Sequence, residues 1–429
     1  MNQARPEPAA PPHSPVQPRH PRPRVMLLAH RIPFPPDKGD KIRSYHLLRH
    51  LARRYDVHLA AFVDDPRDRR HEGRLRELCT DLFLAPIDPR WRRLASLSAL
   101  LSREPLSLRF FADRRLQAWV DQTLARQPFD AVVTYSSTMA RFVAGPAYES
   151  LNRIADFIDV DSEKWAQYAR TSRWPGSWIY GREARTLLAY ERRIAARFHR
   201  TLFVSAAEAQ LFVERAPECA GRVGYFSNGV DTDYFDPAIA QADPDPYPAG
   251  GPVAVFTGAM DYRPNIEAVQ WFAEEILPLL RRSSPQARFY IVGSNPARAV
   301  RQLAEADGVT VTGRVEDVRP YLRHAQAVVA PLRIARGIQN KVLEAMAMSR
   351  PVVSTAAAAE GIDPQGQAIH GIADSPQAFA DATARAFEAG VQERARALVV
   401  QSFSWESHLR QLDTLIAATR LGCNAAQVA

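Results

Sequence analysis

The sequence of 429 residues is short of cysteine and lysine and lacks any long apolar run. Cys79, Cys219 and Cys423 are widely spaced, which argues against a disulfide framework and fits a reducing compartment. No apolar run reaches the roughly 18 residues that a membrane-spanning helix needs. The first 24 residues are rich in proline, arginine and alanine without the apolar core of a secretory signal, and are expected to form a disordered tail. The sequence therefore predicts a cytoplasmic protein that rests at most on a membrane surface.

Several signature motifs are also missing. Neither half has a Gly-x-Gly-x-x-Gly stretch after its opening strand, and there is no Walker A motif, so a dinucleotide redox cofactor and a P-loop are not indicated. The absence of Gly-x-Ser-x-Gly disfavours an α/β-hydrolase. His46 and His50 share a helix face but have no metal-binding spacing with acidic or cysteine partners, and they are better explained as a partly exposed pair. Neither a redox cofactor nor a histidine-based metal site is therefore expected.

The net charge of +8 points to an anionic partner or to no partner at all. The simplest explanation is that the chain uses many arginines on an otherwise ordinary surface, in which case the net charge has no specific function. The functional alternatives are an anionic membrane surface, an anionic substrate or nucleic acid. Nucleic acid ranks last, because no zinc-finger or RNA-binding signature is present.

Strand and helix patterns alternate along the chain in two successive runs, which predicts an α/β fold of two Rossmann-like domains facing across a cleft. The predicted strands of the first run are 24–29, 57–63, 82–87, 130–135, 153–160, 201–204 and 223–226, with helices at 40–54, between 91 and 126, and at 179–199. The second run has strands at 253–258, 288–293, 309–313, 327–331 and 351–355, with helices at 264–282, 296–306, 317–324 and after 337. Ser404 is the expected N-cap of a last helix that ends near Thr419.

These patterns set the expected domain boundaries. The predicted parts are a tail at 1–24, a first domain at 25–226, a linker at 227–252, a second domain at 253–401, a helix at 402–420 that crosses back to the first domain, and a tail at 421–429. The linker is dense in residues that break helices and strands. Because ligands of open α/β sheets bind beyond the carboxyl ends of the strands, the loops from strand to helix are the candidate sites.

The stretch from Gly337 to Ala347 lies between two buried-strand patterns and is the strongest site signal. A glycine-led loop that runs into a helix points N–H groups and the helix dipole at an anion. Asn340 lies at the helix start, Lys341 adds a mobile positive charge, and Glu344 follows about one turn later. This set suits a nucleoside diphosphate, with amides and lysine for phosphate and a carboxylate for ribose hydroxyls.

The scarcity of lysine strengthens this prediction. Only four of the 55 basic residues are lysine, and all four lie in stretches that are site candidates on other grounds: Lys38, Lys41, Lys164 and Lys341. Lysine is a compact charge on a flexible stem whereas arginine is a rigid fork, so a site can require one of them. The alternative is that four residues fall there by chance.

Two loops of the first half are further candidates. In the loop after the first strand, Lys38, Gly39 and Lys41 are predicted to meet phosphate or an acceptor, the alternative being a rigid turn with solvated charges. At the end of a later strand, Asp159 and Asp161 alternate and so project on one face. Paired carboxylates can hold a metal or supply a catalytic base with its electrostatic partner, although one of them can equally cap the next helix.

Two loops of the second half complete the set. Gly258 ends the first strand of this half and lets a ligand approach the backbone. Arg263 follows at a helix start, where its fork geometry suits a phosphate, the alternative being a solvated arginine. Gly313 ends another strand, and the main chain of Val315 beyond it can meet the edge of a nucleotide base. As a single signal the last of these is weak.

Taken together, these residues resemble a GT-B glycosyltransferase of the large retaining family 4. The resemblance rests on the Gly39 loop, on Ser227-Asn228-Gly229-Val230-Asp231 with Phe235 at the domain junction, on Thr257-Gly258, on 313–318 and on 341–347. His30–Ser44, Asp156–Trp165 and 337–347 resemble most closely the subgroup associated with exosortase, or PEP-CTERM, systems. Enzymes of that subgroup are thought to serve exopolysaccharide or surface-glycan assembly.

The resemblance implies transfer of a hexose-type sugar from a nucleotide-sugar, with retention at the anomeric carbon, to a glycan or a lipid-linked acceptor. The second domain holds the donor and the first holds the acceptor. Glu344 matches the second glutamate of the family's paired-glutamate motif and binds ribose, and Arg263 matches the phosphate-binding arginine. Asp159 and Asp161 are read as acceptor-binding or electrostatic groups, because GT-B enzymes generally hold the diphosphate without a metal.

The sequence departs from the family pattern in three places. Arg336 stands eight residues before Glu344, where the first glutamate of the pair is expected. The lysine that normally follows the phosphate-binding arginine is missing from 264–266, and Lys341 is the hypothetical replacement. The acidic stretch around Asp159 occupies the region where the first domain normally offers a histidine. A nucleotide-sugar epimerase on the same scaffold and a non-catalytic glycan- or nucleotide-binding protein therefore remain alternatives.

Overall fold

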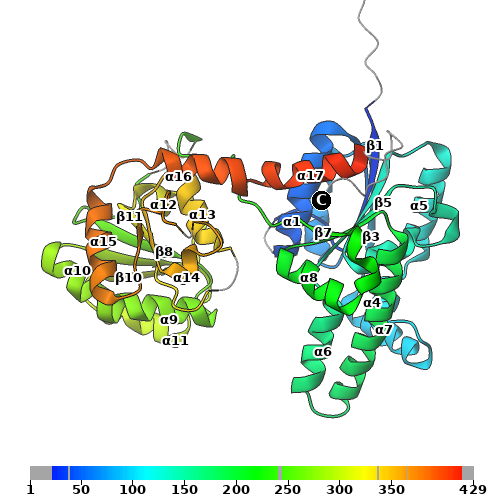
Figure 1. Cartoon of the computed structure of the whole chain (residues 1–429), viewed down its shortest axis with the longest axis horizontal. Helices are drawn as coiled ribbons and strands as arrows, with labels where there is room; N and C mark the ends of the chain where they lie inside the picture. Colours follow the sequence, from blue (N-terminus) through cyan, green and yellow to red (C-terminus); the bar gives the residue numbers. More distant parts are fainter. Residues whose placement is uncertain (1–21, 37–38, 240–243, 336–337, 364, 418–429) are drawn as a thin grey trace, which may run out of the picture. The chain divides into compact units, whose positions relative to one another are not determined.

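The computed structural model describes residues 22–36, 39–239, 244–335, 338–363 and 365–417, and it divides the chain into two units (Figure 1). The first unit contains the described parts of Met1–Phe203, Ala207–Gly224 and Leu415–Ala429. The second unit contains Val204–Ala206 and the described part of Tyr225–Thr414. Each unit has a hydrophobic core of its own. The described residues leave out 1–21 of the predicted tail at 1–24, the last residues 418–420 of the predicted helix and the whole predicted tail at 421–429 with Cys423. Lys38, Arg336 and Gly337 also lie outside them.

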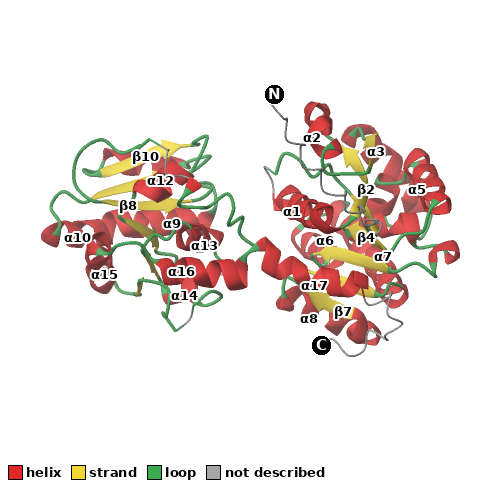
Figure 2. Ribbon diagram, turned by 90° about the horizontal axis from the view of Figure 1, so that it is seen from above, coloured by secondary structure: helices red, strands yellow, loops and turns green. Residues whose placement is uncertain are grey.

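A sheet of seven strands forms the centre of the first unit, in the order β3-β2-β1-β4-β5-β6-β7. Its strands are β1 (Arg24–Ala29), β2 (Asp56–Val63), β3 (Asp81–Pro86), β4 (Ala131–Tyr135), β5 (Arg153–Ile158), β6 (Arg200–Phe203) and β7 (Val223–Tyr225). The pairs from β3 to β6 are parallel. Continuous apolar runs form these strands because helices cover both faces of the sheet (Figure 2).

The helices of the first unit follow the strands in Rossmann-like alternation. They are α1 (Gly39–Arg54), α2 (Glu72–Arg76), α3 (Pro89–Ser96), α4 (Leu106–Phe110), α5 (Arg114–Arg126), α6 (Asp161–Thr171), α7 (Gly176–Arg197) and α8 (Ala206–Arg215). Short 3-10 helices occur at η1 (Pro66–His71), η2 (Leu97–Leu101), η3 (Ser137–Val143), η4 (Pro146–Tyr148) and η5 (Pro217–Arg222). The sequence prediction missed α6, which lies along α7 as a projecting hairpin (Figure 1).

The second unit repeats the architecture with six strands, in the order β10-β9-β8-β11-β12-β13. The strands are β8 (Val253–Thr257), β9 (Arg288–Val292), β10 (Val309–Gly313), β11 (Ala327–Ala330), β12 (Val352–Ser354) and β13 (Gly371–Ile372). All of their pairings are parallel. The expectation of two Rossmann-like α/β domains is therefore confirmed.

Helices surround this second sheet. They are α9 (Arg263–Trp271), α10 (Leu277–Ser283), α11 (Arg298–Gln302), α12 (Arg319–His324), α13 (Asn340–Ala347), α14 (Ala356–Ala359), α15 (Pro376–Glu388), α16 (Glu393–Leu398) and α17 (Trp405–Ala417). A π-helical turn, η7 (Phe272–Ile276), joins α9 to α10, so the single helix predicted at 264–282 contains a local widening. A second π turn, η9 (Val399–Phe403), precedes α17, and η8 (Leu303–Glu305) follows α11.

The start of α17 explains the glycine at the predicted domain junction. Val230 forms a parallel bridge with Ser404, and its N–H donates to the Phe403 carbonyl at 2.8 Å. A Cβ on Gly229 would lie 2.4 Å from the main-chain nitrogen of Trp405, so only glycine permits this approach. The Ser404 hydroxyl accepts the N–H of Ser407 at 3.1 Å, which confirms the predicted helix cap. From this start α17 runs out of the second unit and into the first.

Candidate active site

In the second unit, three glycines stand at the carboxyl ends of neighbouring strands. Gly258 follows β8, Gly293 follows β9 and Gly313 ends β10. The Gly258 N–H donates to the Val292 carbonyl at 3.0 Å, and the Gly293 N–H donates to the Gly313 carbonyl at 3.1 Å. A Cβ on Gly293 would lie 1.6 Å from the Gly258 oxygen. These contacts leave the sheet edge without side chains, at the place where parallel sheets bind ligands.

Lys341 reaches this edge from the first turn of α13. Its ammonium donates to the Asn265 side-chain oxygen at 2.5 Å and lies 4.4 Å from the centre of the Phe256 ring. Asn265 in turn donates to the Ala259 carbonyl at 2.9 Å. A Cβ on Gly258 would lie 2.8 Å from the Asn265 amide nitrogen and 3.6 Å from the Lys341 Cε. Gly258, Asn265 and Lys341 therefore form one packed cluster.

Asn265 is the functional candidate that the sequence prediction missed. It occupies the position after Pro264, within the stretch 264–266 from which the expected lysine is missing in this chain. The buried Asn265 side chain fixes the direction of the Lys341 stem. The two residues are 76 positions apart in the sequence, so their contact could be found only from the folded chain.

Lys341 and Glu344 are both partly buried one helical turn apart, and both titrate near neutrality. Burial lowers the pKa of Lys341 to about 8, and the charge of Glu344 opposes this shift. Burial likewise raises the pKa of Glu344 to about 7, against the charge of Lys341. Groups with such shifted pKa values cluster at functional sites.

The beginning of α13 adds main-chain donors to the lysine. Asn340 is the first helical residue and is exposed. Gln339 occupies the cap position without a side-chain hydrogen bond to the helix end. The first N–H groups of a helix carry the positive end of its dipole and are suited to an anion. Asn340 and Lys341 thus lie at an anion-attracting helix end, whereas the predicted loop residue Gly337 lies outside the described residues.

The other two predicted donor residues lie differently. Arg263 begins α9 with 88% of its side chain exposed and forms an ion pair with Glu267 at 2.8 Å. Val315 is partly buried and packs against the core of the second unit beyond β10. Because exposed helical ion pairs are weak, Arg263 can exchange Glu267 for another anion at little cost.

In the first unit, a buried ion pair lies at the carboxyl end of β5. Arg43 of α1 donates to both carboxylate oxygens of Asp156, at 2.9 and 3.1 Å, and both side chains are 1% exposed. Lys41, a predicted cleft residue, is also buried and lies 2.6 Å from Asp68. Its ammonium already has a carboxylate partner, and Gly39 is the first residue of α1. The Arg43–Asp156 pair anchors α1 to β5, and the Lys41–Asp68 pair anchors it to η1, which follows β2.

Asp159 and Asp161 follow this pair. Asp159 is exposed, while Asp161 is partly buried and begins α6. Although Asp159 is exposed by its accessible surface, desolvation by the surrounding protein raises the pKa of both carboxyls, and the charge of the nearby Lys164 opposes this shift. The charge of His30 also lowers the pKa of Asp161. Because α6 has no side-chain cap, neither aspartate has the capping role that was the alternative.

Two strained residues mark the same sheet edge. Ser136 after β4 has φ 85°, and Ile158 at the end of β5 has φ 73°. A β-branched residue in this left-handed region is rare and costs on the order of 1–3 kcal/mol. The strain accompanies a register shift between β5 and β6 and turns the chain toward Asp159. Such strain concentrates at functional sites.

Within the described residues, no group of three or more histidine, cysteine, aspartate or glutamate side chains is arranged to hold a metal ion. No described helix combines the length and the hydropathy needed to cross a bilayer.

Comparisons with known proteins agree with this geometry. Residues 251–389 match the family model described as "Glycosyl transferases group 1". No curated protein matches the chain. Among solved structures, a glycosyltransferase from Rickettsia africae ESF-5 shares 12% identity at a TM-score of 0.58, covering 94% of this chain and 100% of the other. Sucrose-phosphate synthase from Thermosynechococcus elongatus shares 18% at 0.57, covering 94% and 100%. HepE of Anabaena, solved with UDP and glucose, shares 15% at 0.57, covering 92% and 99%.

The fold is thus GT-B, with two Rossmann-like domains on parallel sheets. The family match covers most of the second unit, including Gly258, Lys341 and Glu344. Residues 251–389 are therefore similar to the group 1 glycosyltransferases, and the whole chain has the fold of such enzymes.

Proposed function

We propose that the protein is a retaining glycosyltransferase that moves a hexose-type sugar from a nucleotide-sugar donor to a glycan or lipid-linked acceptor. The observation that carries this proposal is the cluster of Gly258, Asn265 and Lys341 beside the start of α13. It offers an open backbone, a positioned cation and helix N–H groups to one anion. The structure of HepE with UDP shows that a protein of this fold binds such a nucleotide, which supports the same ligand class here.

The donor diphosphate is proposed to bind at Gly258, Asn340 and Lys341. When the bond to the sugar breaks, negative charge builds up on the diphosphate leaving group. The ammonium of Lys341 and the N–H groups of α13 stabilise this charge, which is the largest contribution that a protein usually makes to such a reaction. The sugar meanwhile develops oxocarbenium character.

Other predicted residues are assigned to the parts of the donor and the acceptor. Glu344 binds the ribose hydroxyls as a carboxylate, Arg263 leaves Glu267 for a phosphate, and Val315 contacts the base through its main chain. In the first unit, Asp159 and Asp161 bind the acceptor or receive its proton. The pKa of both aspartates is raised above the ordinary value, which is the direction that favours a group that takes up a proton.

The cellular setting is proposed from the sequence resemblance to the exosortase-associated subgroup. The acceptor is then part of an exopolysaccharide or surface glycan that is assembled on a lipid. The protein works in the cytoplasm and binds peripherally to the inner membrane, and its positive net charge suits an anionic lipid surface.

A transfer assay with Asp161→Asn tests this proposal. The purified protein is incubated with the nucleotide-sugar that binds best and with a lipid extract as acceptor, and the product is analysed by mass spectrometry and NMR. We expect a new glycoside with retained anomeric configuration. The variant should transfer about 100-fold more slowly with unchanged donor affinity, because proton transfer typically contributes 10²–10⁴-fold. Tight donor binding without turnover over an acceptor panel would favour the scaffold alternative, and an epimerised donor without acceptor would identify an epimerase.

A further inference from the structure

The segment formed by α3 and η2 presents apolar side chains to solvent. Trp91, Leu94, Leu97 and Leu101 are 71%, 60%, 45% and 94% exposed, and we call them the α3–η2 stripe. Their spacing of three, three and four residues places them along one side of a helical segment. Isolated exposed leucines are ordinary, but a continuous stripe that includes a tryptophan marks an interaction surface.

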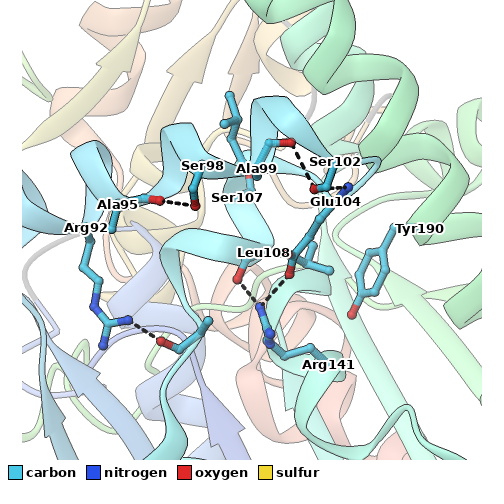
Figure 3. A network of polar contacts seen from close by, with 12 residues as sticks. Arg92, Ala95, Ser98, Ala99, Ser102, Glu104, Ser107, Leu108, Arg141 and Tyr190 are labelled. Carbon is cyan, nitrogen blue, oxygen red and sulfur yellow. Dashed lines mark hydrogen bonds and ion pairs between the residues drawn. The ribbon is translucent and has the colours of Figure 1, made fainter.

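The opposite side of this segment is fixed to the first unit by polar groups (Figure 3). Arg92 donates to the Asp113 carboxylate at 2.7 Å and to the Ala112 carbonyl. The buried guanidinium of Arg182 donates to the carbonyls of Ala99 and Ser102, at 2.6 and 2.5 Å. Polar contacts therefore hold the inner side while the apolar residues face outward, the reverse of an ordinary surface helix.

The helix after this segment is held just as firmly. The buried Glu183 carboxylate accepts the N–H groups of Leu106 and Ser107 at 2.7 and 2.9 Å, at the beginning of α4. The stripe is thus a feature of a rigid, anchored segment rather than a loosely packed one. Buried charged side chains thus hold the segment in the position in which these apolar residues are exposed.

Unbalanced positive charge accompanies the stripe. Arg90, Arg93 and Arg103 are exposed on and beside the same segment. The first two line a pocket of about 740 Å³ beyond the ends of β2 and β3. Asp64 pairs with Arg31 at 3.0 Å. Asp88 accepts the neutral main-chain N–H of Arg90 at 2.8 Å and so keeps its negative charge, which the three exposed arginines outnumber. The surface around the stripe is therefore net positive.

A second aromatic group extends this surface. Trp174 and Trp178, at the tip of the hairpin of α6 and α7, are 81% and 53% exposed. Trp178 precedes Arg182 by one helical turn, so it lies on the face of α7 that reaches the carbonyls of η2. Exposed tryptophans among arginines are typical of proteins that rest at the boundary between lipid and water.

We propose that the α3–η2 stripe and its flanking arginines dock the first unit on an anionic lipid bilayer. The proposal rests on the proposed function, to which it adds a defined surface for meeting a lipid-linked acceptor. Tryptophan and leucine side chains enter the interfacial layer, while Arg90 and Arg93 contact anionic headgroups. The pocket that these arginines line then opens at the bilayer surface, where the headgroup of the acceptor lies.

Vesicle binding by the full chain tests the docking surface without donor or acceptor. Sedimentation is measured with vesicles of phosphatidylglycerol and phosphatidylcholine, and with phosphatidylcholine alone. We expect binding to the anionic vesicles only. The double variant Leu94→Gln/Leu101→Gln should bind at least about tenfold more weakly, because it removes two inserted apolar side chains. The control Ile239→Gln/Val391→Gln removes two apolar residues of the second unit that are each 62% exposed, and it should bind like the wild type.

Charge reversal supplies an independent measurement. Arg90→Glu/Arg93→Glu should abolish binding to anionic vesicles, whereas Arg126→Glu/Arg298→Glu, with the same change of net charge at other exposed positions, should retain most of it. All of these side chains are exposed, so the melting temperatures should stay close to that of the wild type.

Three results would overturn the proposal: no binding to anionic vesicles, equal loss in the stripe and control variants, or a stripe variant that changes only the oligomeric state. The last would assign the surface to a second copy of the chain. Nucleoside diphosphate binding is measured on the same samples, and it tests the donor site separately because Gly258 and Lys341 belong to the second unit.

Discussion

Replacing Lys341 by methionine separates binding of the donor from stability of the fold. Methionine keeps the unbranched stem that packs near Gly258 and Phe256 while it removes the charge. If Lys341 holds the diphosphate, its removal deletes a charge-assisted hydrogen bond. Such bonds contribute about 1.5–3 kcal/mol, which corresponds to a loss of affinity of about 10- to 150-fold.

The stability of the unliganded protein should respond in the opposite direction or hardly at all. Burial lowers the pKa of Lys341 from 10.5 to about 8, so the folded state disfavours its charged form by about 3 kcal/mol. The ammonium recovers part of this through Asn265 and the Phe256 ring, each contributing about 1 kcal/mol. Removal of the ammonium also leaves the buried Asn265 oxygen without this donor, which costs about 1–3 kcal/mol and offsets the relief of the desolvation of the lysine. The melting temperature should therefore change little.

Calorimetric titration with the best-binding nucleoside diphosphate between pH 6 and 9.5 measures both the size and the origin of the effect. A depressed lysine pKa means that the charge is present below pH 8 and is lost as the pH rises through that value. Wild-type affinity should thus weaken by up to about tenfold per pH unit above pH 8. Lys341→Met should be weak and should lack this decline above pH 8. Equal affinity of the two proteins at pH 7, or the same pH dependence in both, would refute the assignment.

Three further predictions concern single contacts. Glu344→Gln should raise the melting temperature at pH 8 more than at pH 5. Burial raises the pKa of the Glu344 carboxyl from 4.5 to about 7, so its ionisation above pH 7 destabilises the fold by up to about 3 kcal/mol, a cost that glutamine removes. Equal shifts at both pH values would contradict this. Asp156→Asn leaves the buried Arg43 without a carboxylate and should cost about 3–5 kcal/mol in urea unfolding, whereas a loss below about 1 kcal/mol would show that the pair is replaceable. Gly293→Ala places a methyl 1.6 Å from the carbonyl oxygen beyond β8 and should abolish donor binding or folding, while Gly221→Ala meets no atom within 4 Å and should do neither, as circular dichroism and calorimetry can show.

Local patterns were sufficient to predict most strands and the cap of the last helix. Strands such as β1 and β8 are continuous apolar runs because both faces of their sheets are covered, and such runs are visible in the sequence. Ser404 could be recognised because a cap depends only on residues a few positions away. The helix α6 could not be predicted, because its polar sequence is stabilised by packing on α7. The sequence analysis predicts no element between Thr355 and Ser402, where the structure has α14, β13, α15 and α16.

The candidate site was predictable in part. The Lys341 loop and Gly258 follow from strand-to-helix chemistry, but Asn265 acquires a role only through a contact across 76 residues. The pairing of Arg43 with Asp156 likewise spans 113 residues. The exposure of Trp91 could not be predicted from the sequence, because apolar residues at helical spacing usually face a core, and the buried polar anchors of this segment are visible only in the folded chain.

The most direct test of the central claim is a thermal-shift panel of UDP, GDP, ADP, CMP and their common sugar conjugates, with and without Mg²⁺. A donor site built from Lys341, Asn265 and the start of α13 predicts that one nucleoside diphosphate and its sugar conjugate raise the melting temperature without requiring the metal. The same ligand should have little effect on Lys341→Met at pH 7. If none of these compounds stabilises the wild type, or if the stabilisation is unchanged in the variant, the proposed donor site is contradicted.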